Sequence, residues 1–179
     1  MSQTTLLGIS GSLRGASINS LLVREAARVF EPDSFVQANL RLPLFDGDLE
    51  KEGIPAEVQL LADQITAADA VVISGPEYNK SLSGVLKNAL DWVSRTKGRP
   101  FRDKPVAIMS ATSGTSGGLM TQAALRLALY SFRPRLLQGP AVLVGGGAKA
   151  FDDQGHLTGT REAEALAELM ADLKREITR

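Results

Sequence analysis

The sequence predicts an α/β protein in which a parallel sheet is covered by helices on both faces. Short apolar runs of strand length alternate along the chain with stretches whose apolar residues recur at helical spacing, in the order βαβαβαβαβα. The runs at 70–74 and 106–109 carry apolar residues at successive rather than alternate positions, as in a strand buried on both faces. The length of 179 residues is that of one ordinary domain, so we expect a single domain over residues 1–179.

Each element follows from its own pattern. Strands are expected at 5–10, 34–40, 70–74, 105–110 and 140–144, and helices at 18–30, 58–65, 85–93, 118–132 and 160–177. The last helix, for example, places Leu166, Leu169, Leu173 and Ile177 on one stripe. Five parallel strands at this spacing favour the flavodoxin-like doubly wound order 2-1-3-4-5, whose ligand crevice lies at the carboxyl ends of strands one and three.

Composition excludes several kinds of chemistry. The absence of cysteine removes disulfides, thiolate metal sites and thiol nucleophiles, and the lone His156 cannot form an imidazole cluster. Twenty basic residues balance twenty acidic ones, which argues against a nucleic-acid partner. No window approaches the ~20 apolar residues that span a bilayer, so we expect no membrane partner and a cytoplasmic location.

The loop after the first strand has the residue types of a phosphate site. It gathers hydroxyl groups, glycines and one guanidinium at the start of a helix, through Ser10, Ser12, Arg14, Ser17 and Asn19. Free helix N–H groups, the helix dipole and a single arginine together favour a bound phosphate. The alternative is an ordinary helix cap by Ser17 or Asn19 with Arg14 in solvent. The loop matches neither a Walker A motif nor the dinucleotide fingerprint, because the chain has no Gly-Lys pair and the glycine spacing differs.

Two further loops follow later strands. Residues 75–84 contain Tyr78, whose ring offers an aromatic face, and backbone amides that can lie along the edge of a planar heterocycle; an ordinary turn explains this loop as well. Residues 110–118 again collect glycines and hydroxyl groups at a helix start, where backbone can approach a ligand closely.

These loops resemble those of the NADPH-dependent FMN reductase family, which includes bacterial quinone and chromate reductases. The resemblance rests on Gly11-Ser12-Leu13-Arg14, on Pro76-Glu77-Tyr78-Asn79, and on the helix at 84–92 that follows. Phe151-Asp152 with Gly155 and Leu157 extends it toward the carboxyl terminus. Two positions depart from the common pattern: Lys80 stands where relatives often have glycine or an aromatic residue, and Ser83 where many have proline.

The resemblance implies FMN as cofactor and NADPH or NADH as co-substrate. It places Ser10, Ser12, Arg14, Ser17, Ile18 and Asn19 around the phosphate, and Pro76, Glu77, Tyr78, Asn79, Lys80 and Ser81 along the ring, with Ser113, Gly114, Gly117 and Gly118 completing the pocket. The flavin itself carries the hydride chemistry, so no catalytic side chain and no metal are expected. Quinones, free flavin or similar small molecules are the expected acceptors. A homodimer or homotetramer is expected, and Trp92 is a candidate interface residue.

Two other functions fit parts of the sequence. A flavodoxin-type electron carrier would share the fold and cofactor, but such carriers tend to be strongly acidic. A serine hydrolase would use Ser116, within Gly114-Thr115-Ser116-Gly117-Gly118, together with Asp152 and His156. Against the hydrolase, the preceding strand is expected to end near Ser110, too early for a strained turn at Ser116.

Overall fold

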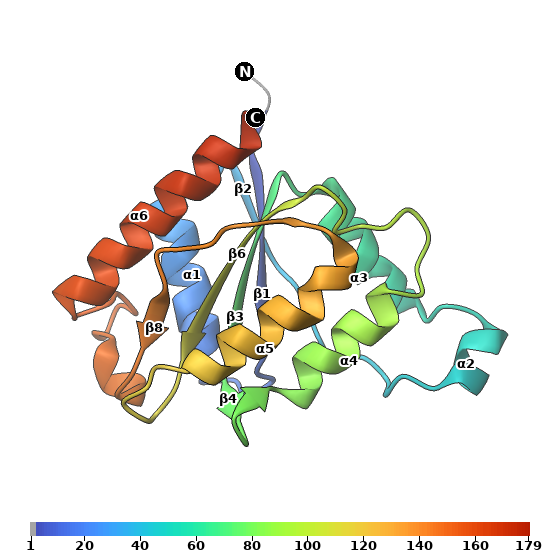
Figure 1. Cartoon of the computed structure of the whole chain (residues 1–179), viewed down its shortest axis with the longest axis horizontal. Helices are drawn as coiled ribbons and strands as arrows, with labels where there is room; N and C mark the ends of the chain where they lie inside the picture. Colours follow the sequence, from blue (N-terminus) through green and yellow to red (C-terminus); the bar gives the residue numbers. More distant parts are fainter. Residues whose placement is uncertain (1–2) are drawn as a thin grey trace.

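A parallel sheet forms the centre of the molecule in a computed structural model that describes residues 3–179. Its strands lie in the order β2-β1-β3-β6, with two short strands beside β6 at the far edge (Figure 1). The strands are β1 (Thr5–Ser10), β2 (Ser34–Gln37), β3 (Ala70–Gly75), β6 (Pro105–Ala111), β7 (Arg135–Leu136) and β8 (Val142–Val144). The pairings of all these strands are parallel, which confirms the doubly wound order expected from the sequence.

The fifth position of the sheet is shared by two strands instead of one. β7 pairs with the start of β6 at Pro105 and Val106, and β8 pairs with its end at Met109 to Ala111. The segment between them leaves the ladder after Leu137, whose N–H donates to the Val106 carbonyl at 3.0 Å, and it contains Pro140, which has no N–H to donate. The strand expected at 140–144 therefore begins only at Val142, and the strand expected at 34–40 ends at Gln37.

Helices cover both faces of the sheet, and each face has its own apolar core. One face carries α1 (Ile18–Phe30) and α6 (Thr160–Ile177), and the other carries α3 (Ala56–Ala67), α4 (Gly84–Val93) and α5 (Leu119–Leu129) (Figure 1). Successive residues of β3 alternate between the two cores: Val72 belongs to the first, and Val71 and Ile73 to the second. This is the packing that an unbroken apolar run in a parallel strand requires.

The remaining elements are short and were not expected as such. They are α2 (Gly47–Glu52), the hairpin of β4 (Glu77–Tyr78) and β5 (Ser81–Leu82), and the 3-10 helices η1 (Tyr130–Phe132) and η2 (Gly147–Ala150). Helix α2 buries no residue, so no apolar stripe marks it in the sequence. Within residues 3–179, no helix combines the length and apolarity that crossing a bilayer requires.

Trp92 lies in the interior of the protein, so the expectation that it forms an interface is wrong. Its side chain is 0% exposed. The indole Nε1 donates to the carbonyl of Pro43 at 2.8 Å, and the ring of Phe45 meets it edge to face at 5.0 Å between centroids. The tryptophan thus holds the segment before α2 against α4.

The close approach of α1 to β1 requires glycine at position 8. A Cβ built there would lie 2.3 Å from Val23 Cγ1 and 2.8 Å from the Phe35 ring. We expect Gly8→Ala to lower the free energy of unfolding by about 1 to 3 kcal/mol in a denaturant titration, because neither neighbour can yield without moving its element. Gly47→Ala is the control, since nothing lies within 4 Å of its Cβ. Equal effects of the two substitutions would contradict the packing argument.

Candidate functional site

A cleft of about 380 Å³ lies where the carboxyl ends of β1, β3 and β6 meet. It is at the lower edge of the molecule in Figure 1, around the β4 hairpin. Three loops line it, and they are the three that the sequence singled out. Its lining residues are Ser12, Arg14, Ser17, Ile18, Asn19, Pro76, Glu77, Tyr78, Lys80, Ala111, Thr112, Ser113, Gly114 and Ser116.

The first loop ends in a helix start that is open to an anion. The Ser17 hydroxyl caps α1 by accepting from the Ser20 N–H at 3.3 Å, and the Ser17 carbonyl accepts from the Leu21 N–H at 3.0 Å. The N–H groups of Ile18 and Asn19 have no acceptor among residues 3–179. Backbone donors of this kind at a helix N-terminus, together with the helix dipole, form a ready anion site.

Arg14 supplies a positive charge beside this helix start. Its side chain is exposed, and its guanidinium makes no ion pair or hydrogen bond with any other described residue. The loop that carries it is held by the Arg14 N–H, which donates to Ser12 Oγ at 3.4 Å. The guanidinium therefore has all its donors available for a ligand.

The Asn19 side chain forms its hydrogen bonds with the protein and not with the cleft. Its Nδ2 donates to the Ala111 carbonyl at 3.0 Å, while its Oδ1 accepts from Ser74 Oγ at 2.8 Å and from the Ala111 N–H at 3.1 Å. The residue is 2% exposed. Its side chain thus ties the start of α1 to the ends of β3 and β6, and its backbone N–H is what it presents to the cleft.

Ser10 lies outside the cleft lining, and its side chain supports the first loop from below. Its buried hydroxyl accepts from Ser20 Oγ at 2.9 Å and from the Ser12 N–H at 3.4 Å. These bonds fix the turn between β1 and α1.

The second loop is a two-residue hairpin. Asn79 and Lys80, between β4 and β5, have φ values of 51° and 62°, the left-handed pair of a type I′ turn. Asparagine is a preferred residue for such a turn, whereas Lys80 stands where glycine is usual. The turn brings Lys80 into the cleft lining, while Asn79 and Ser81 lie outside it.

Side-chain bonds hold this hairpin to its neighbours. Glu77 Oε2 accepts from the Met120 N–H in the first turn of α5 at 2.9 Å, where the helix dipole favours its negative charge. Ser83 Oγ donates to the Gly11 carbonyl at 2.7 Å and accepts from the Leu86 N–H at 3.3 Å. Ser83, a departure from the common family pattern, therefore caps α4 and joins the first two loops.

In the third loop, Ser113 and Gly114 line the cleft, and Gly117 and Gly118 shape the chain behind it. A Cβ at Gly117 would lie 2.5 Å from the backbone of Leu143, and the backbone there has φ 61°. Gly118, with φ 89°, is the residue that precedes α5. The Ser110 hydroxyl donates to the Gly117 carbonyl at 2.6 Å and keeps the loop folded against the sheet.

Ala111, Thr112 and Ser116 complete the lining and were absent from the predicted site. The signal for the first two was their place directly after a predicted strand, since β6 runs one residue further than expected and ends at Ala111.

The hydrolase constellation is not assembled. Ser116 lines the cleft, but Asp152 and His156 do not. The Asp152 carboxylate accepts from the N–H groups of Gln154 at 2.9 Å and His156 at 2.8 Å, and the pKa of Asp152 is lowered chiefly by the bond from His156. His156 lies in this turn, with 38% of its side chain exposed. Among residues 3–179 there is also no cluster of three or more potential metal ligands.

The doubly wound sheet, with a cleft at its switch point and a helix start that leaves backbone N–H groups free, defines a flavodoxin-like protein. The NADPH-dependent FMN reductase family matches residues 4–149, which is most of the chain. The chain belongs to this family, as the sequence resemblance indicated.

Individual relatives agree with this assignment. The chain is 39% identical over 171 residues to an NAD(P)H-dependent FMN reductase of Pseudomonas aeruginosa, covering 94% of this chain and 92% of the relative. It is 39% identical over 163 residues to a quinone reductase of Escherichia coli, covering 83% and 87%. Among solved structures, the flavoenzyme NAD(P)H:(acceptor) oxidoreductase of Paracoccus denitrificans superposes with a TM-score of 0.87 at 29% identity, over 98% of this chain and 97% of that one.

The Asn19 side chain yields a stability prediction. We expect Asn19→Ala to lower the free energy of unfolding by about 2 to 4 kcal/mol, because it leaves the buried Ser74 hydroxyl and the Ala111 N–H without partners. Asn39→Ala is the control, since Asn39 is exposed and accepts one local bond from the Arg41 N–H. Chemical denaturation of both variants measures the difference, and a cost for Asn19→Ala no larger than that of the control would refute the assigned role.

Proposed function

We propose that the chain binds FMN in this cleft and uses it to pass electrons from NAD(P)H to quinones or similar small acceptors. The observation that carries the proposal is the free anion site formed by the N–H groups of Ile18 and Asn19 and by Arg14. In the proposed arrangement the FMN phosphate occupies this site. Because the same cleft continues to the β4 hairpin and the third loop, the ring lies between Tyr78 and the backbone of residues 111–114.

The residues present suit this cofactor. The cleft volume of about 380 Å³ falls in the range of cofactor sites, and its lining mixes hydroxyl groups with the apolar surfaces of Ile18, Pro76 and Tyr78. A dianionic phosphate needs fixed donors and a positive charge, which the helix start and Arg14 supply. A planar heterocycle needs flat walls, and the hairpin supplies one through Tyr78.

Bound FMN supplies the redox chemistry, accepting a hydride equivalent from NAD(P)H and delivering electrons to the acceptor. The chain's own residues bind the cofactor, orient its ring and set the charge around it. Lys80 brings a positive charge to the ring-facing side of the cleft, where its Nζ lies 3.8 Å from Glu77 Oε1. With FMN bound, a cation at this position would favour negative charge on the ring.

The proposed acceptors rest on the relatives and on the shape of the site. The Escherichia coli relative is a quinone reductase and the Pseudomonas aeruginosa relative an FMN reductase. Tyr78, 52% exposed, stands at the mouth of the cleft and offers a flat apolar surface to an aromatic acceptor.

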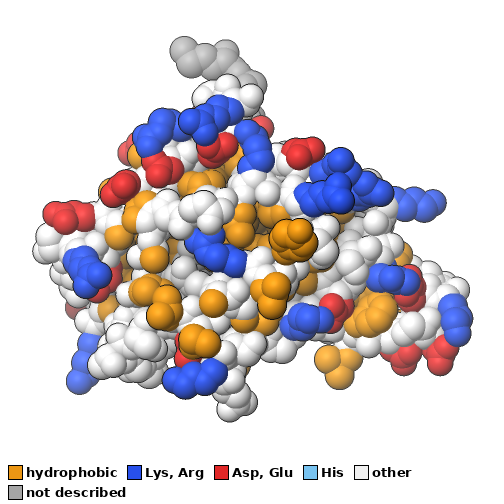
Figure 2. All heavy atoms as spheres, in the orientation of Figure 1, with side chains coloured by type: hydrophobic (Ala, Val, Ile, Leu, Met, Phe, Trp, Pro, Cys, Tyr) orange, Lys and Arg blue, Asp and Glu red, His pale blue; other side chains and the backbone are white. Residues whose placement is uncertain are grey.

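We also propose that the protein assembles as a homodimer or homotetramer. Helix α5, the start of η1 and the segment before α2 expose large apolar side chains, which are Leu44, Phe45, Leu119, Met120, Leu127 and Tyr130. In Figure 2, hydrophobic side chains gather over the face where α5 runs in Figure 1. An apolar row of this length on a helix favours association between copies.

Arg14 provides the first test of the phosphate assignment. Arg14→Ala should weaken FMN binding by about 1.5 to 3 kcal/mol, or roughly 10- to 150-fold, because a charge-assisted bond is lost. Riboflavin, which lacks the phosphate, should bind as before. Arg24→Ala, an exposed arginine on α1 outside the cleft, is the matched control. Titration of apoprotein with both flavins measures the affinities, and equal weakening of the two flavins would move the phosphate elsewhere.

Anaerobic spectroscopy tests the proposed electron transfer from NAD(P)H to the acceptor. NADPH or NADH alone should bleach the bound flavin, and a quinone added afterwards should restore the oxidised spectrum. Each half-reaction should be complete within seconds, in keeping with turnover numbers of about 1 to 1,000 per second. An electron carrier would bind FMN but stay oxidised until a separate reductase was added. Bound flavin that neither nucleotide bleaches would overturn the oxidoreductase assignment.

A further inference from the structure

A second cavity, of about 390 Å³, lies at the opposite end of the sheet from the flavin cleft. It is formed by the chain after α4 and by η1, and its lining residues are Val93, Ser94, Thr96, Arg99, Pro100, Arg102, Ser131, Phe132 and Arg133. These segments adjoin the start of β6, whereas the flavin cleft lies at its end. Seven residues of strand separate the two by roughly 20 Å.

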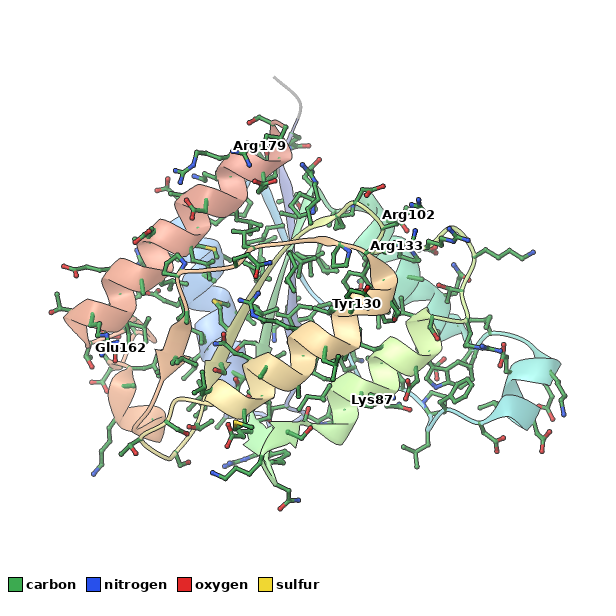
Figure 3. The ribbon with its side chains drawn as sticks, viewed as in Figure 1. Lys87, Arg102, Tyr130, Arg133, Glu162 and Arg179 are labelled. Carbon is green, nitrogen blue, oxygen red and sulfur yellow. The ribbon has the colours of Figure 1, made fainter. Side chains whose placement is uncertain are left out.

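Three arginines surround this cavity. Figure 3 shows Arg102 and Arg133 next to each other at the upper right of the molecule, and the same region of Figure 2 carries a dense group of basic side chains. Arg99 and Arg133 form no ion pair with any residue of 3–179. Arg102 meets only Asp103, at 3.6 Å, and that carboxylate is 81% exposed. No carboxylate is among the lining residues, so the charges of Arg99 and Arg133 are not neutralised there.

This charge is not a by-product of a basic protein. The chain as a whole carries no net charge. Two neighbouring cations have structural roles: Arg95 pairs with Glu50 at 2.8 Å, and the Lys104 Nζ donates to the carbonyls of Thr66 and Ala68. The three arginines of the cavity have no comparable role.

The backbone at two of the three arginines has the left-handed conformation, which arginine adopts less readily than glycine. Arg99 has φ 52° and Arg133 has φ 54°. A side chain in this left-handed region costs about 1 kcal/mol or more, and glycine would adopt it freely.

The site is also rigidly framed. The Asp103 N–H donates to the Arg133 carbonyl at 3.0 Å, and the Arg102 N–H donates to the Arg99 carbonyl at 2.9 Å. Beneath them, Phe101 is buried and meets Phe132 edge to face at 5.6 Å. These contacts fix the two segments that carry the arginines, so little ordering is needed when a ligand binds.

We propose that this cavity binds a small phosphorylated anion of nucleotide size. Guanidinium groups match phosphate oxygens in pairs of parallel hydrogen bonds, and three of them suit a ligand with several phosphate oxygens. The hydroxyl groups of Ser94, Thr96 and Ser131 add polar contacts, and Val93, Pro100 and Phe132 give an apolar floor for the rest of the molecule. The site is independent of the flavin cleft and of the reaction proposed there.

Equilibrium titration of protein loaded with one equivalent of FMN, and freed of unbound FMN, tests this proposal, because the bound FMN keeps the other phosphate site filled and none is left to compete for this cavity. At low ionic strength, tripolyphosphate and ATP should bind with dissociation constants in the micromolar to low-millimolar range, and adenosine should not bind. Tighter binding of ATP than of tripolyphosphate would identify a nucleotide as the ligand, and equal binding would identify the phosphate chain alone. Either result supports the site. Absence of saturable binding of both anions up to about 10 mM would overturn it.

The double variant Arg99→Gly/Arg133→Gly separates recognition from folding. Glycine relieves the strain at both positions, so the melting temperature should stay or rise, while affinity for the anions falls about 100-fold. Arg24→Ala removes one exposed positive charge elsewhere and should change the affinity by less than about twofold. Unchanged anion binding in the folded double variant, or an equal loss in the control, would overturn the proposal.

Discussion

The side chain of Asn19 is the interaction on which the cleft depends. One buried amide joins the first turn of α1 to Ser74 at the end of β3 and to Ala111 at the end of β6. Because both of its ends are used, it sets the distance between the helix start and the two strand ends. The anion-binding N–H groups and the two loops that leave β3 and β6 are therefore held in one fixed frame. A ligand spanning this frame meets donors whose positions were set during folding.

The loops are attached to this frame by separate bonds. Ser83 links the second loop to the first through the Gly11 carbonyl, and Ser110 holds the third loop through the Gly117 carbonyl. All of these hydroxyl groups are buried, so their bonds are shielded from water and losing one partner is costly. The Arg14 guanidinium in the cleft lining, in contrast, has no partner among residues 3–179. The site thus separates residues that build it from residues that face the ligand.

Most of the fold could be predicted from the sequence because its strands and helices carry strong apolar patterns. Elements without a buried stripe, such as α2, leave no such pattern, and the division of the fifth strand depends on local geometry around Pro140. For the site, residue type and position after a strand identified the three loops. They did not distinguish a side chain that faces the cleft from one that turns away from it. Asn19 and Ser10 have the residue types of phosphate ligands, yet both direct their side chains into the protein. The prediction that Trp92 lies at an interface was wrong for a related reason. A large aromatic residue on a helix stripe suits an interface and a core equally well. Only the structure shows that the segment containing Pro43 and Phe45 covers this side chain.

The bond between Glu77 and the Met120 N–H has a consequence for how the molecule moves as a whole. It connects the hairpin at the mouth of the cleft to the first turn of α5, the helix whose outer side carries the exposed apolar row. If the hairpin swings outward, α5 loses the carboxylate that caps its first turn, and that turn is free to fray. Opening of the mouth and loosening of the outer helix are therefore one mechanical event. A contact that holds the first turn of α5 in place therefore also holds the Glu77 carboxylate and, through it, the hairpin.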